Sequence, residues 1–175
     1  STTGFNGGEM PYLHFTNDSM LIENSKEDFD GWNELSVFAV LEPARSTWHI
    51  HFGKLRNAAD VGWAFFSLRP DFTPPQYAFA MRETSAEDYL KTFTDVFFKP
   101  GILHLRYGGG RRQLYYNGDK LIDTADSGTP QKLTDLPLTI GSPPELTQAS
   151  NMKLGEFLIY KSVLSDSNRL KIEGY

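Results

Sequence analysis

The segment from Ile102 to Thr124 most constrains what this chain can fold into. Its first part, ILHLRY, alternates apolar and polar residues with the two-residue period of a half-buried β-strand. The run Gly108–Gly110 interrupts that strand, and LYY then begins another. Asn117-Gly118 is a strong hairpin signal, because both central positions of a type I′ turn need a positive φ. The segment therefore predicts a three-stranded antiparallel meander.

Much of the remaining chain consists of similar short apolar or alternating runs bounded by turn residues. The strands expected outside the meander are Pro11–Thr16, Met20–Asn24, Glu34–Glu42, Ser46–Lys54, Gly62–Arg69, Gln76–Glu83, Thr92–Phe98, Leu136–Gly141 and Leu154–Lys161. Ser165 is placed to cap a short helix over Asp166–Glu173. Short strands without a strand–helix–strand alternation predict an all-β fold, an antiparallel two-sheet β-sandwich or jelly roll with a short C-terminal helix.

The charge and composition of the chain limit the kinds of partner and site that it can have. The net charge is −5, and no run of basic residues exceeds Arg111-Arg112, which argues against nucleic acid as a partner. No apolar run approaches the roughly 18 residues of a membrane span. Cysteine is absent, so disulfides and thiolate metal sites are excluded. We expect residues 1–175 to form one domain excised from a longer protein, because the chain starts without Met and shows no signal peptide.

Four segments together resemble the laminin-G-like branch of the concanavalin A-like lectin/glucanase superfamily. They are Phe5-Asn6-Gly7-Gly8 leading to Tyr12-Leu13, the strand Leu35–Pro43, the stretch Leu103–Leu121 with its Y-x-G and L-Y-x-N-G elements, and Ile140-Gly141-Ser142 followed by Gly155–Ser165. Two positions depart from the pattern of that branch. Gly101-Ile102 replaces a Trp-His pair, and Asn117 replaces the Asp of a D-G turn.

The resemblance implies a concanavalin A-like jelly roll that serves as an accessory module binding sugars or proteins. It carries no shared catalytic motif, so no enzymatic activity is expected. Similar modules occur in secreted carbohydrate-active enzymes, bacterial adhesins, and viral tail or fibre proteins. The implied location is therefore extracellular, at a cell surface or on a virion.

Aromatic residues make up 14% of the chain and supply the first candidate site. Exposed Trp and Tyr rings can stack on the apolar face of a pyranose while its polar edge stays in water. The candidate stacking residues are Trp32, Trp48, Trp63, Tyr77, Tyr107 and Tyr116. Most such rings are expected in the core. Trp32 lies in a polar loop and Tyr116 beside a turn, so these two are the ones expected to be exposed.

His49 and His51 are two residues apart in an alternating run, so they are expected on one face of a strand. A His-x-His pair can ligate a metal with a third ligand, act as a general base, or hydrogen-bond a sugar. A strand His serves the jelly-roll polysaccharide lyases as a base, but their Lys/Ala/Gly/Tyr strand is absent. Sugar binding or a structural role is favoured over catalysis.

Three aspartates and one arginine complete the set of candidate site residues. Asp18, Asp28 and Asp30 fall in early loops, where carboxylates could hold a structural calcium ion, although solvated acidic turns explain them as well. Arg111 lies beside the glycine run and could clamp an anion, or simply belong to a polar hairpin.

These observations favour a non-catalytic, lectin-like module that binds a glycan or glycoconjugate. The alternative is a structural or protein-interaction module, such as part of a phage fibre or adhesin, which could form an oligomer within a larger assembly. A polysaccharide lyase is the least favoured of the three.

Overall fold

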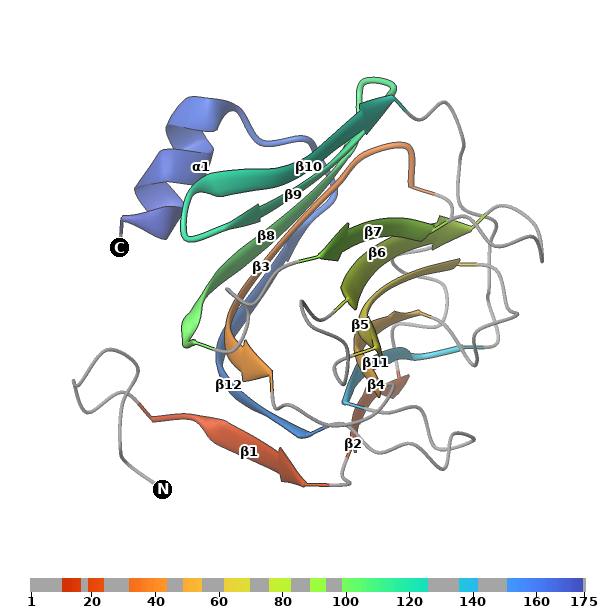
Figure 1. Ribbon diagram of the computed structural model, residues 1–175, viewed down its shortest axis with the longest axis vertical. Helices are drawn as coiled ribbons and strands as arrows, with labels where there is room; N and C mark the ends of the chain where they lie inside the picture. The colour runs from red at the N-terminus through yellow and green to blue at the C-terminus, as the bar shows by residue number, and fades with distance from the viewer. Residues whose placement is uncertain are drawn as a thin grey trace.

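The computed structural model describes residues 11–16, 19–23, 32–43, 49–54, 62–69, 76–82, 89–93, 99–125, 136–141 and 151–174. In this part of the chain the strands form two antiparallel sheets that face each other (Figure 1). The predicted two-sheet antiparallel β-sandwich with a short C-terminal helix is confirmed.

The first sheet, sheet A, contains the meander and the two longest strands. Its order is β1 (Leu13–Thr16), β12 (Asn151–Tyr160), β3 (Leu35–Pro43), β8 (Gly101–Gly108), β9 (Arg111–Tyr116) and β10 (Asp119–Ala125). Sheet B has the order β2 (Ser19–Ile22), β11 (Leu138–Gly141), β4 (His49–Lys54), β5 (Gly62–Arg69), β6 (Gln76–Arg82) and β7 (Tyr89–Phe93).

The meander is built as its sequence predicts. Asn117 and Gly118 have φ angles of 51° and 84°, which place both central residues of the β9–β10 turn in the left-handed region. The Asn117 side chain also accepts a hydrogen bond of 2.8 Å from the backbone N–H of Ile102, which ties the turn to β8. Gly109 and Gly110, with φ of 61° and 72°, make the β8–β9 turn.

Most strands lie within one or two residues of their predicted bounds, but two begin three residues earlier than predicted. β12 begins at Asn151 rather than Leu154, because Asn151–Leu154 pair with β1 and the strand also pairs with β3 from Met152 onward. β7 covers Tyr89–Phe93, where it pairs with β6, and so starts before the predicted Thr92–Phe98. Residues 94–98 lie outside the described part.

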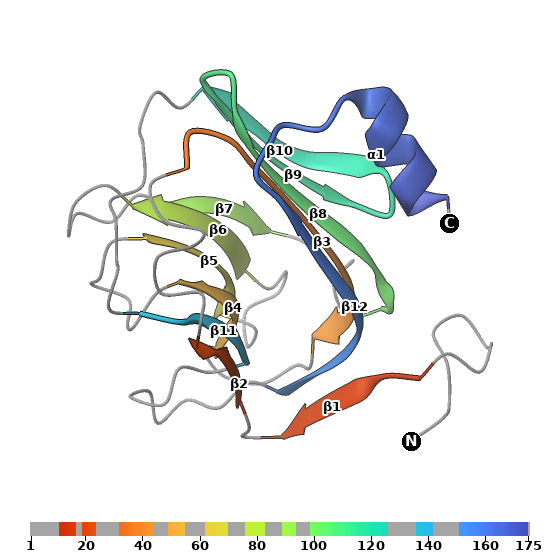
Figure 2. The same ribbon diagram turned by 180° about the vertical axis from the view of Figure 1, so that it is seen from behind.

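Helix α1 (Asp166–Glu173) has the predicted bounds and the predicted cap. The Ser165 hydroxyl accepts a hydrogen bond of 3.3 Å from the backbone N–H of Asn168. The helix lies on the side of sheet A that faces away from sheet B, beside β8–β10 (Figure 2). Among the described residues no helix has the length and apolarity that a bilayer crossing demands.

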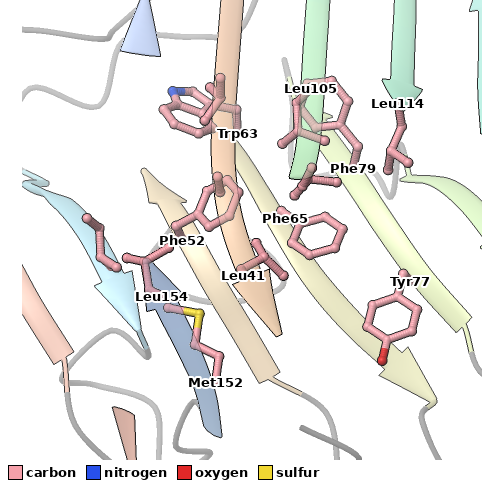
Figure 3. Packing of buried hydrophobic residues seen from close by; sticks show 14 of the residues in the cluster. Leu41, Phe52, Trp63, Phe65, Tyr77, Phe79, Leu105, Leu114, Met152 and Leu154 are labelled. Atoms are coloured by element: carbon pink, nitrogen blue, oxygen red, sulfur yellow. The ribbon is translucent and has the colours of Figure 1, made fainter. Parts of the chain in front are cut away.

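The core fills the space between the two inner faces, the faces that the sheets turn toward each other (Figure 3). Phe65 of β5 has no exposed surface and lies with its ring centroid 5.6 Å from that of Phe52 and 6.0 Å from that of Tyr77. Leucines from sheet A, Leu41 and Leu105 among them, complete the same cluster. Alternate residues of each sheet A strand therefore belong to the core, and the others form its outer face.

Replacement of Phe65 by Ala should lower the free energy of unfolding by about 3–5 kcal/mol, because it leaves a cavity in this packed layer. Leu170→Ala on α1, where the leucine is 57% exposed, is the control and should change that free energy by under about 0.5 kcal/mol. Chemical denaturation of both variants measures the difference. Equal losses would contradict the assignment of Phe65 to the core.

Candidate ligand-binding face

The outer face of sheet A is ordered in rows that run across its strands. Strand pairing places Ser36, Arg106, Gln113 and Asp123 opposite one another on β3, β8, β9 and β10, and Tyr160 of β12 lies at the other end of this row. The next row along the strands contains Leu158, Phe38, His104, Tyr115 and Lys120. Side chains of these rows point away from the core.

A charged cluster occupies the β9–β10 end of the first row. Asp123 accepts hydrogen bonds from Nε of Arg111 at 2.6 Å and from Nζ of Lys120 at 2.5 Å. The bond from Lys120 and the neighbouring Arg111 lower the pKa of Asp123 from 3.8 to about 2. Asp123 therefore stays ionised and holds both cations in place. We name Arg111, Lys120 and Asp123 the cationic cluster.

The cluster is open to solvent. The side chains of Arg111 and Lys120 are 50% and 46% exposed, respectively. A planar guanidinium has more N–H donors than one carboxylate oxygen engages, and it binds carboxylates in a bidentate manner. The arrangement can therefore present a fixed cationic donor to an anionic or hydroxyl-rich ligand.

An aromatic ring lies at the same end of sheet A. Arg111 pairs with Gly108, and Gly108 lies against Asn33, the residue that follows Trp32. The indole of Trp32 is half-buried against the core, and Nζ of Lys161 lies 5.2 Å from its ring centroid. Of the predicted ligand-binding residues, Trp32 and Arg111 both keep exposed surface and both lie at this end of sheet A.

Helix α1 covers the middle of the second row, at His104 and Tyr115. Arg106 donates to Asp166 at 3.0 Å, and the guanidinium carbon of Arg169 lies 4.6 Å from the ring centroid of Tyr115. His104 and Tyr115 are buried beneath the helix. The helix thereby leaves the cationic cluster as the open part of this region.

The other predicted stacking residues that the structure describes, Trp63, Tyr77, Tyr107 and Tyr116, are core residues, and their rings are not open to a ligand in this structure. Trp63, Tyr77 and Tyr116 are at most 2% exposed because each lies on an inner face. Tyr116 was expected at the surface from its place beside the turn. Strand alternation instead directs it inward, where its hydroxyl donates to the carbonyl of Lys99 at 2.5 Å and burial raises its pKa.

His51 is also buried, although the sequence offers it as a candidate for binding a sugar or a metal. The pairing of β4 with β5 shifts between Ile50 and Phe52, so His51 occupies a β-bulge. The bulge lets both His51 and Phe52 be fully buried, and the His51 ring centroid lies 5.5 Å from that of Phe65. A ligand on the surface cannot reach this imidazole. The structure describes only the backbone of His49, in β4.

The remaining candidates are not tested. Trp48, Asp18, Asp28 and Asp30 lie outside the described residues, so calcium stays a prediction. Within the described residues no three or more His, Asp or Glu side chains are grouped as a metal site would need.

Sequence reasoning missed Lys120 and Asp123. The signal available was the N-G turn, from which the pairing across β9 and β10 can be counted. A two-residue turn alone would place Ile122 opposite Gln113. A bulge between Lys120 and Ile122 places Asp123 there instead, on the face of the cationic cluster.

No family model matches this sequence, and no curated protein matches it either. Solved structures do share the fold. The CBM40 module of the Ruminococcus gnavus IT-sialidase, bound to α2,3-sialyllactose, superposes with a TM-score of 0.69 at 10% identity, covering 94% of this chain and 96% of that one.

The binding domain of botulinum neurotoxin DC superposes as well. In its complex with rat synaptotagmin II the TM-score is 0.63 at 13% identity, over 89% of this chain. In its complex with SialylT the TM-score is 0.62 at 12% identity, over 82% of this chain. This chain spans only 39% and 36% of those two toxin chains. At such identities the likeness shows the fold alone, an antiparallel two-sheet β-sandwich.

The ion pairs of the cationic cluster make a testable prediction. NMR titration of the Asp123 carboxyl should give a pKa of about 2, below its ordinary value of 3.8. Lys120→Met and Arg111→Met should each raise that pKa, because each removes a cation that stabilises the carboxylate. Arg106→Met, which breaks only the bond to Asp166, should leave it unchanged. An Asp123 pKa near 3.8 in the unaltered protein would contradict the cluster.

Proposed function

We propose that this chain is a non-catalytic, lectin-like carbohydrate-binding module. The observation that carries the proposal is the whole-chain similarity to a module solved with a sialylated trisaccharide. The neurotoxin domain solved with SialylT adds a second carbohydrate-bound example of the fold. The proposal includes an extracellular location and a place in the laminin-G-like branch.

The cationic cluster is the binding site in this proposal. Arg111 is half exposed and fixed by Asp123, so a ligand meets a donor that is already ordered. Sialylated glycans carry a carboxylate, and a guanidinium engages a carboxylate through parallel hydrogen bonds. Trp32, at the same end of sheet A, supplies aromatic surface for a neighbouring sugar ring.

Binding to a glycan array, followed by calorimetry with 3′-sialyllactose and lactose, tests this function. We expect the sialylated sugar to bind more tightly than lactose, because lactose lacks the carboxylate. The array is repeated with a chelator, and loss of binding would support the calcium prediction. A folded protein that binds no glycan on a broad array would contradict the proposal.

Arg111→Ala should weaken binding of the sialylated sugar about tenfold or more, the effect of losing a charged hydrogen bond. The matched control is Lys153→Ala, which removes a cation of the same sheet that pairs with Glu42, away from the cluster. Calorimetry on both variants measures the change. An equal loss in the control would show that net charge, and not Arg111, determines affinity.

A protein-interaction module is the second candidate, and strand β2 favours it. β2 forms an edge of sheet B, and its Met20, Leu21 and Ile22 are 41%, 37% and 38% exposed. Edge strands of monomers usually carry a charge or proline that blocks further pairing, and β2 (SMLI) has neither. Light scattering of the isolated chain separates the candidates, since a stable oligomer favours this second one.

A further inference from the structure

The contact between α1 and sheet A contains a buried histidine. His104 of β8 has no exposed surface, and its ring is stacked between two aromatic rings of neighbouring strands. The centroid distances are 4.1 Å to Phe38 of β3 and 5.2 Å to Tyr115 of β9. α1 closes this stack from the outside, with Arg169 placed over Tyr115. We call the contact of α1 with His104 and Tyr115 the α1 interface.

Charged groups of α1 meet at this interface. Arg169 donates to Oε2 of Glu173 at 2.6 Å, and Oε1 of Glu173 lies 3.9 Å from Nδ1 of His104, beyond hydrogen-bond distance. Next to this pair, Arg106 of β8 is bonded to Asp166. The Glu173 carboxylate is therefore already neutralised by a cation of its own helix.

The polar atoms of the α1 interface are incompletely paired. Among the described residues, neither ring nitrogen of His104 has a hydrogen-bond partner, and Nε of Arg169 and Oε1 of Glu173 also have none. A buried polar atom without a partner costs about 1–3 kcal/mol relative to one in water. Departure of α1 would let water satisfy these atoms. The unpaired polar atoms therefore make the docking of α1 on sheet A less favourable than its buried aromatic contacts alone would make it.

The surroundings of His104 also oppose its protonation. Burial is the largest effect, and the positive charges of Arg169 on α1 and Arg106 on β8 add to it. Asp166 acts in the opposite direction, and the residues that face His104 from β3 and β9 are the aromatic rings of Phe38 and Tyr115. Together they lower the pKa of His104 from 6.5 to about 3.

We propose that α1 is an acid-released latch, which leaves the outer face of sheet A as the pH falls because His104 binds a proton only after the helix departs. The proposal concerns the conformation of the chain and is independent of glycan binding. Release would separate Arg106 from Asp166 and uncover Phe38 and Tyr115 beside the cationic cluster.

The direction follows from linkage. A histidine in water titrates near its ordinary pKa of 6.5, whereas His104 in the docked state titrates near 3. Below pH 6.5 the released state therefore holds one more proton than the docked state. The ratio of docked to released helix then falls about tenfold per pH unit once the pH is well below 6.5, and roughly sixteen-fold between pH 6.5 and 5.

Amide hydrogen exchange of the whole chain between pH 7 and 5 tests the proposal. After correction for the intrinsic pH dependence of amide exchange, the protection factors of the α1 amides should fall as the pH falls. Those of the β8 amides should stay constant. His104→Phe keeps an aromatic ring in the stack but cannot titrate, so its α1 protection should not depend on pH. His14→Phe, which alters an exposed histidine on β1, should behave like the unaltered protein.

Several outcomes would overturn the latch. They are pH-independent protection of α1 in the unaltered protein, the same pH dependence in His104→Phe, and a parallel loss in β8 that signals global unfolding. NMR titration of the His104 ring provides a measurement that needs no variant. A His104 that becomes protonated near pH 6.5 while α1 stays protected would also overturn the proposal.

Discussion

The rings of Phe52, Phe65 and Phe79 meet the leucines of β3, β8 and β9 between the two sheets, and this contact determines the direction of the side chains around it. Because successive residues of a strand alternate between faces, each residue that packs inward directs its neighbours to the outer face. The inner faces also bury the rings of Tyr77 and Trp63, two of the residues expected to bind sugar. Side chains available for binding must therefore come from the outer faces of the sheets, from strand edges or from loops.

The outer face divides into two parts with different physical character. Under α1, aromatic rings and His104 are excluded from water, and the charges of Arg169 and Glu173 compensate each other. Beside the helix, Arg111 and Lys120 remain open to solvent, and Asp123 holds them in a fixed arrangement. Pre-ordered donors lose little side-chain entropy when a ligand arrives, which favours binding at the open part. The ion pair of Arg106 with Asp166 joins the helix to β8, in the row that also contains Asp123.

Local sequence patterns predicted the fold well, because the turns of this chain have strong signals. Asn117-Gly118 defined the meander and Ser165 defined the start of α1, since both depend only on neighbouring residues. Exposure was harder to predict. Tyr116 was assigned to the surface because it precedes a turn, although its inward direction depends on the register with β8. The bulge at His51 and the bulge that places Asp123 beside Arg111 depend on packing between strands, which no local pattern contains.

The most direct test of the central claim is an NMR titration of the whole chain with 3′-sialyllactose, which maps the backbone amides that respond to the sugar. If the cationic cluster is the binding site, the largest shifts should fall on the β9 and β10 residues around Arg111 and Asp123, and at the neighbouring Trp32. Shifts confined to sheet B, or to the edge strand β2, would contradict the account even if the sugar binds.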